Sequence, residues 1–238
     1  LVDRLNGLFP KALGGQRSHV SVRSEHDLQA FLCFLCYHIM ANAHIKQRLQ
    51  EELGPIMADY PRTQPTWAEL EQAPFLQAVI KEGLRQVSPQ PHYADKKPNY
   101  CSLSFGTMHR RTRVFPQHAL QFKEWTIPAG VPVGMSAYYC HRDPDVFQSP
   151  EEFLPERWLV EVKPEMKRNY VPFSKGSRRC LGTNLAYAEI NYVLAALFRP
   201  GGPQFELFET GEVDVKPAHD LIVPLPSLES KGFRVIFP

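Results

Sequence analysis

The chain has 238 residues, and 27 basic against 25 acidic residues give it a formal net charge of +2. A hydrophobic share of 43% and a charged share of 22% are typical of a globular protein, and a charge this close to zero excludes nucleic-acid or acidic-lipid binding that depends on a strong positive field. Because the sequence lacks an apolar run of about 18 residues and has only five scattered cysteines, we expect no membrane-spanning segment, no disulfide scaffold and a reducing compartment.

Helical patterns dominate the chain as far as Arg85, after residues 1–24, where no element is predicted. Seven apolar residues recur at three- and four-residue steps, which predicts one face of an amphipathic helix: Leu28, Phe31, Leu32, Leu35, Cys36, Ile39 and Met40. A second helix is predicted over His44–Leu53, ending at Gly54-Pro55. Thr66 and Glu69 have the spacing of a capping box. Pro74 suits the first turn of the next helix, whose apolar side carries Leu76, Val79, Ile80 and Leu84.

Short strands and loops follow, with one more long helix. Alternating apolar residues and turn signals predict strands at Leu120–Phe122, Trp125–Ile127, Val131–Met135, Phe205–Phe208, Leu221–Val223 and Phe233–Phe237. One helical turn is predicted at Asp143–Phe147, and a helix over Leu181–Phe198 is ended by Pro200 and two glycines. The fold class is therefore mainly α with a small mixed β-sheet, in a single domain.

The segment from Phe173 to Gly182 concentrates residues with chemical uses immediately before a predicted helix. A thiolate at Cys180 is favoured at a helix N-terminus, where free N–H groups and the helix dipole attract negative charge. Gly176 permits a tight turn, and Arg178 offers a forked donor for a carboxylate. Gly182 and Ala186, one helical turn apart, leave a flat surface for a large planar ligand, and Phe173 can shield the sulfur from water.

This decapeptide resembles the haem-ligand signature of the cytochrome P450 monooxygenases, a Phe-x-x-Gly-x-Arg-x-Cys-x-Gly pattern, at every defined position. The resemblance implies that Cys180 is the axial thiolate of the iron of haem b, and therefore both catalytic and the metal ligand. It also implies that Arg178 pairs with a haem propionate. His109, with the two arginines after it, falls where the family often places a second basic contact to haem carboxylates, and a solvated basic cluster remains the alternative.

Two further motifs agree with this resemblance. Glu82 and Arg85 are spaced i, i+3, and Glu82 lies on an apolar helical stripe, where a carboxylate needs a charged partner. In the family, the Glu-x-x-Arg helix and the arginine of a Pro-Glu-Arg-Trp segment form a buried triad, which here is Glu82, Arg85 and Arg157. Cys33-x-x-Cys36 has the spacing of a metal or redox pair, but core packing is favoured because both lie in an apolar stripe.

The chain departs from the family pattern in two places. The resemblance runs from about Leu28 to the C-terminus, roughly the last half of a family member, and the oxygen-activating central helix with its Gly and Thr motif is not recognisable. Residues 86–102 interrupt a stretch that the family runs through almost directly, so we interpret them as translated intron or a rare insertion. The resulting organisation is a single partial domain over 1–238: an unplaced 1–24, helices over 25–85, the insertion, and then the sheet, ligand loop and C-terminal helix over 103–238.

The resemblance implies a monooxygenase that inserts one oxygen atom from O₂ into a small apolar organic substrate. Trp125–Met135 is most similar to the fungal microsomal-type branch, which oxidises terpenoid or other secondary metabolites. Because no nicotinamide fingerprint is present, electrons are expected from an NADPH-dependent reductase, and nucleic acid is not an expected partner. A full-length family member is expected at the cytosolic face of the endoplasmic reticulum, although no targeting signal follows Leu1. The alternative is a catalytically inactive, truncated haem-binding fragment.

Overall fold

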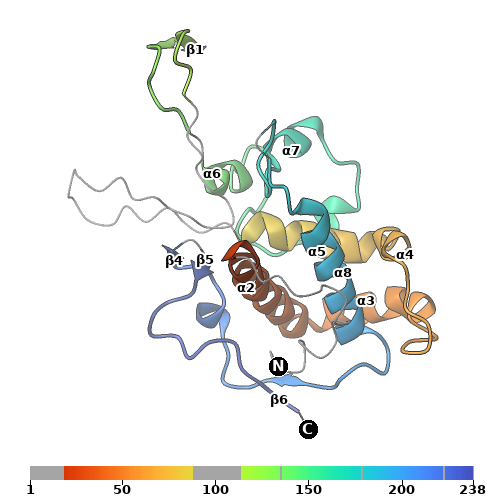
Figure 1. The fold of residues 1–238 in the computed structure, drawn as a ribbon. Helices are drawn as coiled ribbons and strands as arrows, with labels where there is room; N and C mark the ends of the chain where they lie inside the picture. Colours follow the sequence, from red (N-terminus) through yellow and green to blue (C-terminus); the bar gives the residue numbers. More distant parts are fainter. Residues whose placement is uncertain (1–18, 88–113, 135, 178, 222, 238) are drawn as a thin grey trace.

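The computed structural model describes residues 19–87, 114–134, 136–177, 179–221 and 223–237. Its helices are α2 (His19–Ala41), α3 (Ala43–Ile56), α4 (Trp67–Glu71), α5 (Pro74–Gln86), α6 (Ala137–His141), α7 (Pro164–Asn169) and α8 (Thr183–Phe198), with 3₁₀ turns η1 (Pro155–Trp158) and η2 (Glu212–Asp214) (Figure 1). The strands are β1 (Leu120–Phe122), β2 (Trp125–Ile127), β3 (Glu206–Leu207), β4 (His219–Leu221), β5 (Val223–Leu225) and β6 (Val235–Ile236). They pair antiparallel as β1–β2, β3–β6 and β4–β5. The mainly α class is confirmed, but the strands described here form three antiparallel ribbons rather than one mixed sheet.

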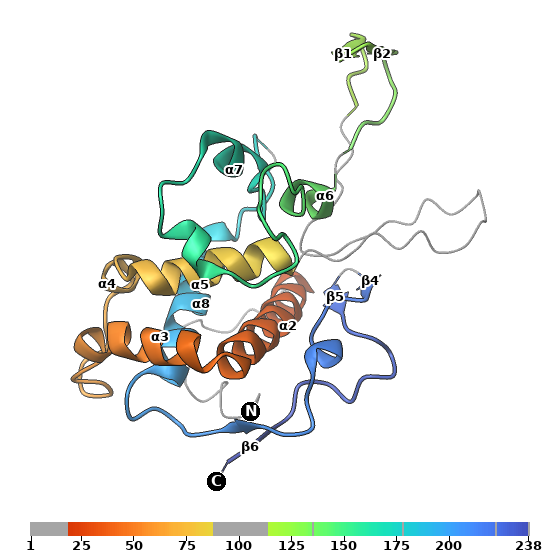
Figure 2. The same ribbon diagram turned by 180° about the vertical axis from the view of Figure 1, so that it is seen from behind.

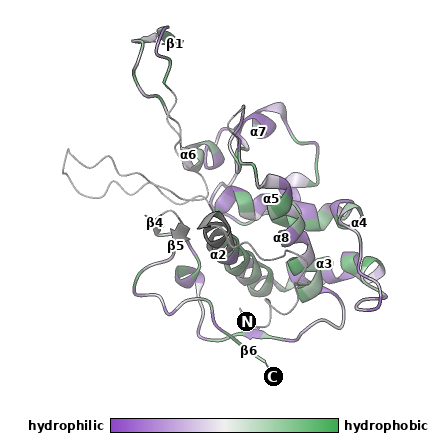
Figure 3. Ribbon diagram, in the orientation of Figure 1, coloured by the Kyte–Doolittle hydropathy of each residue, from purple (hydrophilic) through white to green (hydrophobic). Residues whose placement is uncertain are grey.

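One hydrophobic core lies between α2, α3, α5 and α8, which are neighbours in both views (Figures 1 and 2). The predicted stripe of α2 supplies much of it, since Leu35 and Ile39 are inaccessible to solvent and Leu28 and Met40 are half-buried at its ends. Figure 3 shows predominantly hydrophobic residues along this part of α2. The 3.6-residue period of apolar residues predicted this part of α2 because the helix packs one continuous apolar face against the other helices.

No helix within the described ranges is by itself both long and apolar enough to cross a membrane, although Leu28–Ala41 and Ala43–Ile56, bent by 104°, meet the length and composition test as a pair.

The end of α3 is a correction to the sequence prediction. The helix was expected to end before Gly54-Pro55, but it continues through both residues to Ile56. Proline lacks the N–H that would bond to the carbonyl four residues earlier, so in a last turn it removes a single hydrogen bond. The Met57 N–H still donates to the Leu53 carbonyl at 2.8 Å, which closes the helix.

Specific capping contacts fix the starts of α4 and α5. The predicted capping box is present: the Thr66 N–H donates to Glu69 Oε2 at 2.7 Å, and the Glu69 N–H donates to Thr66 Oγ1 at 3.3 Å. Helix α5 begins at Pro74 as predicted. Its next two backbone N–H groups donate to the two carboxylate oxygens of Glu52, both at 2.8 Å. A carboxylate satisfies helix N-terminal donors well, so Glu52 ties α5 to α3.

Of the predicted strands, those at Phe205–Phe208 and Phe233–Phe237 contain the shorter β3 and β6, which pair with each other. The hairpin of β1 and β2 has the predicted bounds, and both views show it extending away from the helices (Figures 1 and 2). The strand expected at Val131–Met135 is wrong for residues 131–134, where only Val133 makes a bridge. The strand expected at Leu221–Val223 is also wrong, because Leu221 ends β4 and Val223 begins β5, and the two are paired across a tight reversal. Helices α6 and α7 were not predicted, since five or six residues are too few to show a period.

Candidate functional site

The segment from Phe173 to Gly182 forms a tight loop that leads into α8. The Cys180 N–H donates to the Phe173 carbonyl at 3.0 Å, and the Arg179 N–H donates to the Gly176 carbonyl at 3.2 Å. Gly176 has φ +82°, a left-handed conformation that glycine adopts without strain. Nothing lies within 4 Å of a Cβ built at this position. Glycine is therefore required here by the dihedral angle and not by a lack of space.

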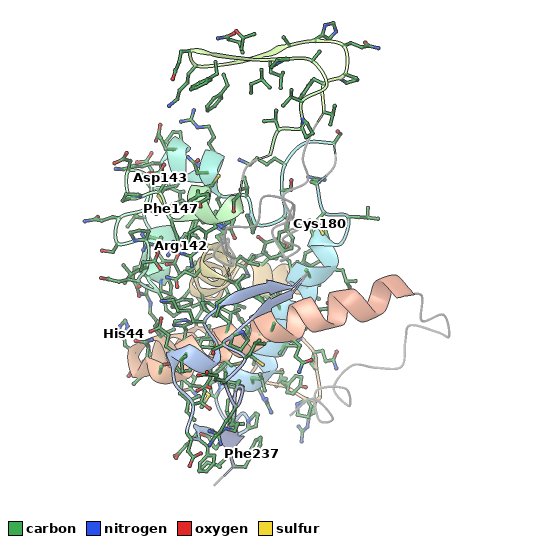
Figure 4. The ribbon with its side chains drawn as sticks, turned by 90° about the vertical axis from the view of Figure 1, so that its left-hand side faces the viewer. His44, Arg142, Asp143, Phe147, Cys180 and Phe237 are labelled. Carbon is green, nitrogen blue, oxygen red and sulfur yellow. The ribbon has the colours of Figure 1, made fainter. Side chains whose placement is uncertain are left out.

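The thiol of Cys180 is exposed at the end of this loop (Figure 4). It precedes Gly182, the N-cap of α8, by two residues, and its carbonyl accepts a hydrogen bond from Thr183 Oγ1 at 2.9 Å. The sulfur, at 3.9 Å, is the nearest atom to a Cβ built on Gly182, so the space beside it is open. Leu181, directly after the cysteine, and Leu185, in the first turn of α8, both expose apolar side chains. The site is thus a thiol beside an open, apolar surface.

Phe173 and Ala186 connect this loop to the core. The Phe173 ring packs 5.4 Å from that of Tyr187 on α8, and both Phe173 and Ala186 are half-buried against the main cluster. Phe173 therefore holds the base of the loop through its ring and through its carbonyl bond to Cys180. Arg178 and His109, the two predicted contacts to haem carboxylates, lie outside the described residues.

The Cys33-x-x-Cys36 pair is unsuited to metal binding or redox chemistry. Cys33 and Cys36 lie in α2, where burial raises the pKa of the Cys33 thiol to about 11 and raises that of Cys36 further. Both thiols therefore stay protonated at neutral pH, as expected of cysteines used for packing. Within the described part of the chain, no three His, Cys, Asp or Glu side chains converge on a metal-binding point.

Glu82, Arg85 and Arg157 are brought together in a second buried cluster. Glu82 and Arg85 are fully inaccessible to solvent, and their side chains pair through Arg85 Nη2 to Glu82 Oε1 at 2.8 Å and Nε to Oε2 at 3.0 Å. Arg157 Nε donates to Glu82 Oε1 at 3.1 Å. Sequence reasoning missed two further donors to this carboxylate: the Trp158 indole N–H at 2.9 Å and the Leu154 backbone N–H at 3.0 Å. The indole could have been anticipated, since a buried Trp N–H needs an acceptor.

The two arginines also bind backbone carbonyls of the last residue of α6 and of the loop that leads from it to η1. Arg85 donates to the carbonyls of His141, Pro150 and Glu152 at 2.8, 2.7 and 3.2 Å. Arg157 donates to those of Gln148 and Ser149 at 2.6 and 3.2 Å. Each guanidinium therefore links the α5 carboxylate to irregular backbone, a task that suits its several fixed donors.

His141 is a further buried residue that sequence reasoning missed. One ring nitrogen, Nδ1, lies 3.1 Å from the Arg85 carbonyl oxygen, and the other, Nε2, accepts the Val171 N–H at 2.9 Å. Its partners are backbone atoms 56 and 30 residues away, so no sequence spacing indicates them.

Comparison with known proteins settles the family. A sequence model described as Cytochrome P450 matches residues 30–98 and 104–228. The chain belongs to the cytochrome P450 family. The interruption predicted at 86–102 overlaps the first matched range, and its first residue, Gln86, is the last residue of α5. Residues 88–102 lie outside the described part of the chain, so the intron or insertion stays a prediction.

Three P450 relatives illustrate the similarity. The chain is 72% identical over 206 residues to the cytochrome P450 monooxygenase oblB of Aspergillus clavatus, which covers 87% of this chain and 36% of that protein. It is 48% identical over 212 residues to stellatic acid synthase of Emericella variicolor, covering 86% and 41%. It is 50% identical over 202 residues to fusicoccadiene C-8 hydroxylase of Phomopsis amygdali, covering 85% and 35%. The chain thus spans between 35% and 41% of the length of these relatives.

The described residues fit the haem-thiolate group that this P450 family implies. A haem brings four nitrogen ligands of its own and needs one axial ligand from the protein, which in P450s is a cysteine thiolate. A single exposed thiol, with open space at Gly182 and two exposed leucines at the start of α8, meets that need. A cluster of several converging protein ligands would not.

Proposed function

We propose that this chain is the haem-ligand part of a monooxygenase that inserts one oxygen atom from O₂ into an apolar secondary metabolite of terpenoid type. The observation that carries the proposal is the exposed Cys180 thiol, held on a loop that matches the family signature and opens onto an apolar surface. The proposed cofactor is haem b, and the proposed electron donor is an NADPH-dependent reductase.

The bound haem would supply the activation of O₂, in which two electrons and two protons convert O₂ and a substrate R–H into R–OH and water. The chain's own residues would hold and orient the group. Cys180 would provide the thiolate that holds the group, and the exposed Leu181 and Leu185 would offer it apolar contacts. Phe173 would restrain the backbone of Cys180 through its carbonyl, which accepts the Cys180 N–H.

The proposed substrate class rests on the names of the relatives. One is called a fusicoccadiene C-8 hydroxylase, a name that denotes oxygen insertion into a diene, and another a stellatic acid synthase. Both names agree with a carbon-rich, weakly polar substrate. The hydrophobic effect would favour the transfer of such a compound from water to an apolar site. The same effect favours contact between the exposed leucines and a planar apolar ligand.

The proposal is tested by a carbon-monoxide difference spectrum of the reduced, haem-reconstituted chain. We expect the red-shifted Soret band of thiolate ligation, its loss in Cys180→Ser, and its retention in Cys33→Ser, a control cysteine in α2. An identical spectrum in Cys180→Ser would refute the assignment of the ligand.

A second measurement separates oxygenase from inactive fragment. The reconstituted chain is supplied with a reductase, NADPH, isotopically labelled O₂ and a panel of cyclic terpene hydrocarbons, and the products are analysed by mass spectrometry. We expect one labelled oxygen atom in the product. A thiolate-type band without any labelled product would favour the inactive haem-binding fragment instead.

A further inference from the structure

We infer that His141 is a positioning residue for Cys180, because its neutral imidazole couples the buried end of α5 to the start of the cysteine loop. The inference rests on the proposed role of Cys180 as haem ligand. It assigns to His141 a task that acts through the backbone, since the imidazole bonds to the Arg85 carbonyl and to the Val171 N–H.

The hydrogen bonds of His141 define its tautomer. A backbone N–H can only donate, so Nε2, which receives the Val171 N–H at 2.9 Å, must be unprotonated. The proton of the neutral ring then lies on Nδ1, 3.1 Å from the Arg85 carbonyl oxygen, which can only accept. One ring therefore satisfies a half-buried donor and a buried acceptor in different segments, and a protonated ring could not do so.

The contact with Arg85 is reciprocal. Arg85 Nη1 donates to the His141 backbone carbonyl at 2.8 Å, while the His141 ring donates to the Arg85 carbonyl. Both residues are fully buried, so loss of either bond would leave a polar group without water to replace its partner. The last turn of α5 and the end of α6 are thereby held as one unit.

The contact with Val171 extends this unit to the thiol. The Val171 carbonyl accepts the Ser174 N–H at 3.1 Å, and the Phe173 carbonyl accepts the Cys180 N–H at 3.0 Å. The Tyr170 ring stacks on His141, with centroids 5.7 Å apart. Restraint on Val171 therefore passes through two successive turns to the backbone of Cys180.

The surroundings of His141 keep its ring neutral. Burial lowers its pKa to about 3, and the nearby cations of Arg85 and Arg142 act in the same direction. Tyr170, whose own pKa burial raises well above the usual value, contributes no charge at neutral pH. The imidazole thus acts as a fixed donor–acceptor pair and not as a proton carrier over the pH range in which enzymes work.

Two substitutions separate the two halves of this bridge. The amide of His141→Gln reaches the position of Nε2, so its oxygen can still accept the Val171 N–H. The shorter amide of His141→Asn reaches only the position of Nδ1 and loses that contact. The matched control is His38→Gln in α2, because His38 is a half-buried histidine whose ring stacks on Phe153, and among the described residues it has no hydrogen bond to the cysteine loop.

Amide hydrogen exchange of the haem-free chain provides a readout that does not depend on oxygenase activity. We expect exchange in the peptide covering residues 171–180 to accelerate by about tenfold in His141→Asn, as for loss of one buried hydrogen bond, with little change in His141→Gln or His38→Gln. The same order should appear after reconstitution, with a smaller fraction of thiolate-type spectrum in His141→Asn alone. Equal acceleration in His38→Gln, or none in His141→Asn, would overturn the inference.

A measurement on the unmodified chain covers the case in which the variants fail to fold. Nitrogen-15 NMR of the imidazole should show a protonated Nδ1 and an unprotonated Nε2, and the opposite tautomer would overturn the inference. Failure of the proposed function is distinguishable, because it would remove the thiolate band from the unmodified chain while leaving the exchange pattern as expected.

Discussion

Replacing Glu82 with glutamine should be among the most damaging conservative changes in this protein. Glu82 accepts five hydrogen bonds, three at Oε1 and two at Oε2, and its side chain is fully buried. A glutamine must place its NH₂ at one of these two positions, where it would face N–H donors instead of an acceptor. At the same time, the charge of the fully buried Arg85 would lose its counter-ion.

The size of the loss follows from that geometry. Removing one partner of a buried ion pair typically lowers the free energy of unfolding by about 3–5 kcal/mol, because the remaining charge is left without compensation. A domain has only about 5–15 kcal/mol in total, so Glu82→Gln should leave the chain close to unfolding at room temperature.

The matched control is the same substitution at Glu156. Its carboxylate lies 3.5 Å from Arg48, and both side chains are more than 40% exposed, so the pair should contribute less than about 1 kcal/mol. Urea unfolding, followed by far-ultraviolet circular dichroism, measures both variants. A loss below about 1 kcal/mol in Glu82→Gln, or equal losses in the two variants, would refute the reasoning.

The remaining predictions concern packing and pH. Gly83→Ala should lower the free energy of unfolding by about 1–3 kcal/mol, because the new Cβ would overlap the Leu35 side chain; thermal unfolding measures this, and an unchanged or raised midpoint would contradict it. Burial lowers the pKa of His141 in the folded chain to about 3 and that of His38 to about 4, from an ordinary pKa of 6.5. Below pH 6.5 the unfolded chain therefore binds more protons than the folded chain. Their contribution to stability should therefore be complete above pH 6.5 and be lost progressively toward pH 3–4, and the stability advantage of the unmodified chain over His141→Gln or His38→Gln should shrink over that range in urea titrations. A constant advantage would contradict it.

The sequence predicted those parts of the fold in which the cause is local. Helix α5 could be assigned from Pro74 and its apolar stripe, and the capping box of α4 from two residues three apart. The end of α3 was wrong because a proline in the last turn costs one hydrogen bond, which tertiary packing outweighs. The missing strand at residues 131–134 shows the same limit, since apolar alternation does not specify a pairing partner.

The candidate site divides along the same line. Cys180, Gly176 and Gly182 were identifiable because the loop is a continuous segment, and Glu82 indicated its need for a partner because a carboxylate on an apolar face must be paired. His141 gave no such signal. Its two partners are a backbone carbonyl and a backbone N–H from distant segments, and every residue has these groups, so only the folded arrangement identifies the bridge.

The position of the thiol explains why so much buried polar structure is remote from it. In the proposed ligand role, Cys180 presents an exposed side that packing cannot fix, so its position depends on its backbone contacts with the Phe173 carbonyl and with Thr183 Oγ1. The segment between α6 and η1 is irregular, so its carbonyls lack the hydrogen-bond partners that a helix or a sheet would supply. Arginine donors serve the carbonyls of residues 141–152, and the imidazole serves Val171. These hydrogen bonds hold irregular backbone against α5 and α6, and we expect them to limit the movement of the loop that carries the proposed Cys180 ligand.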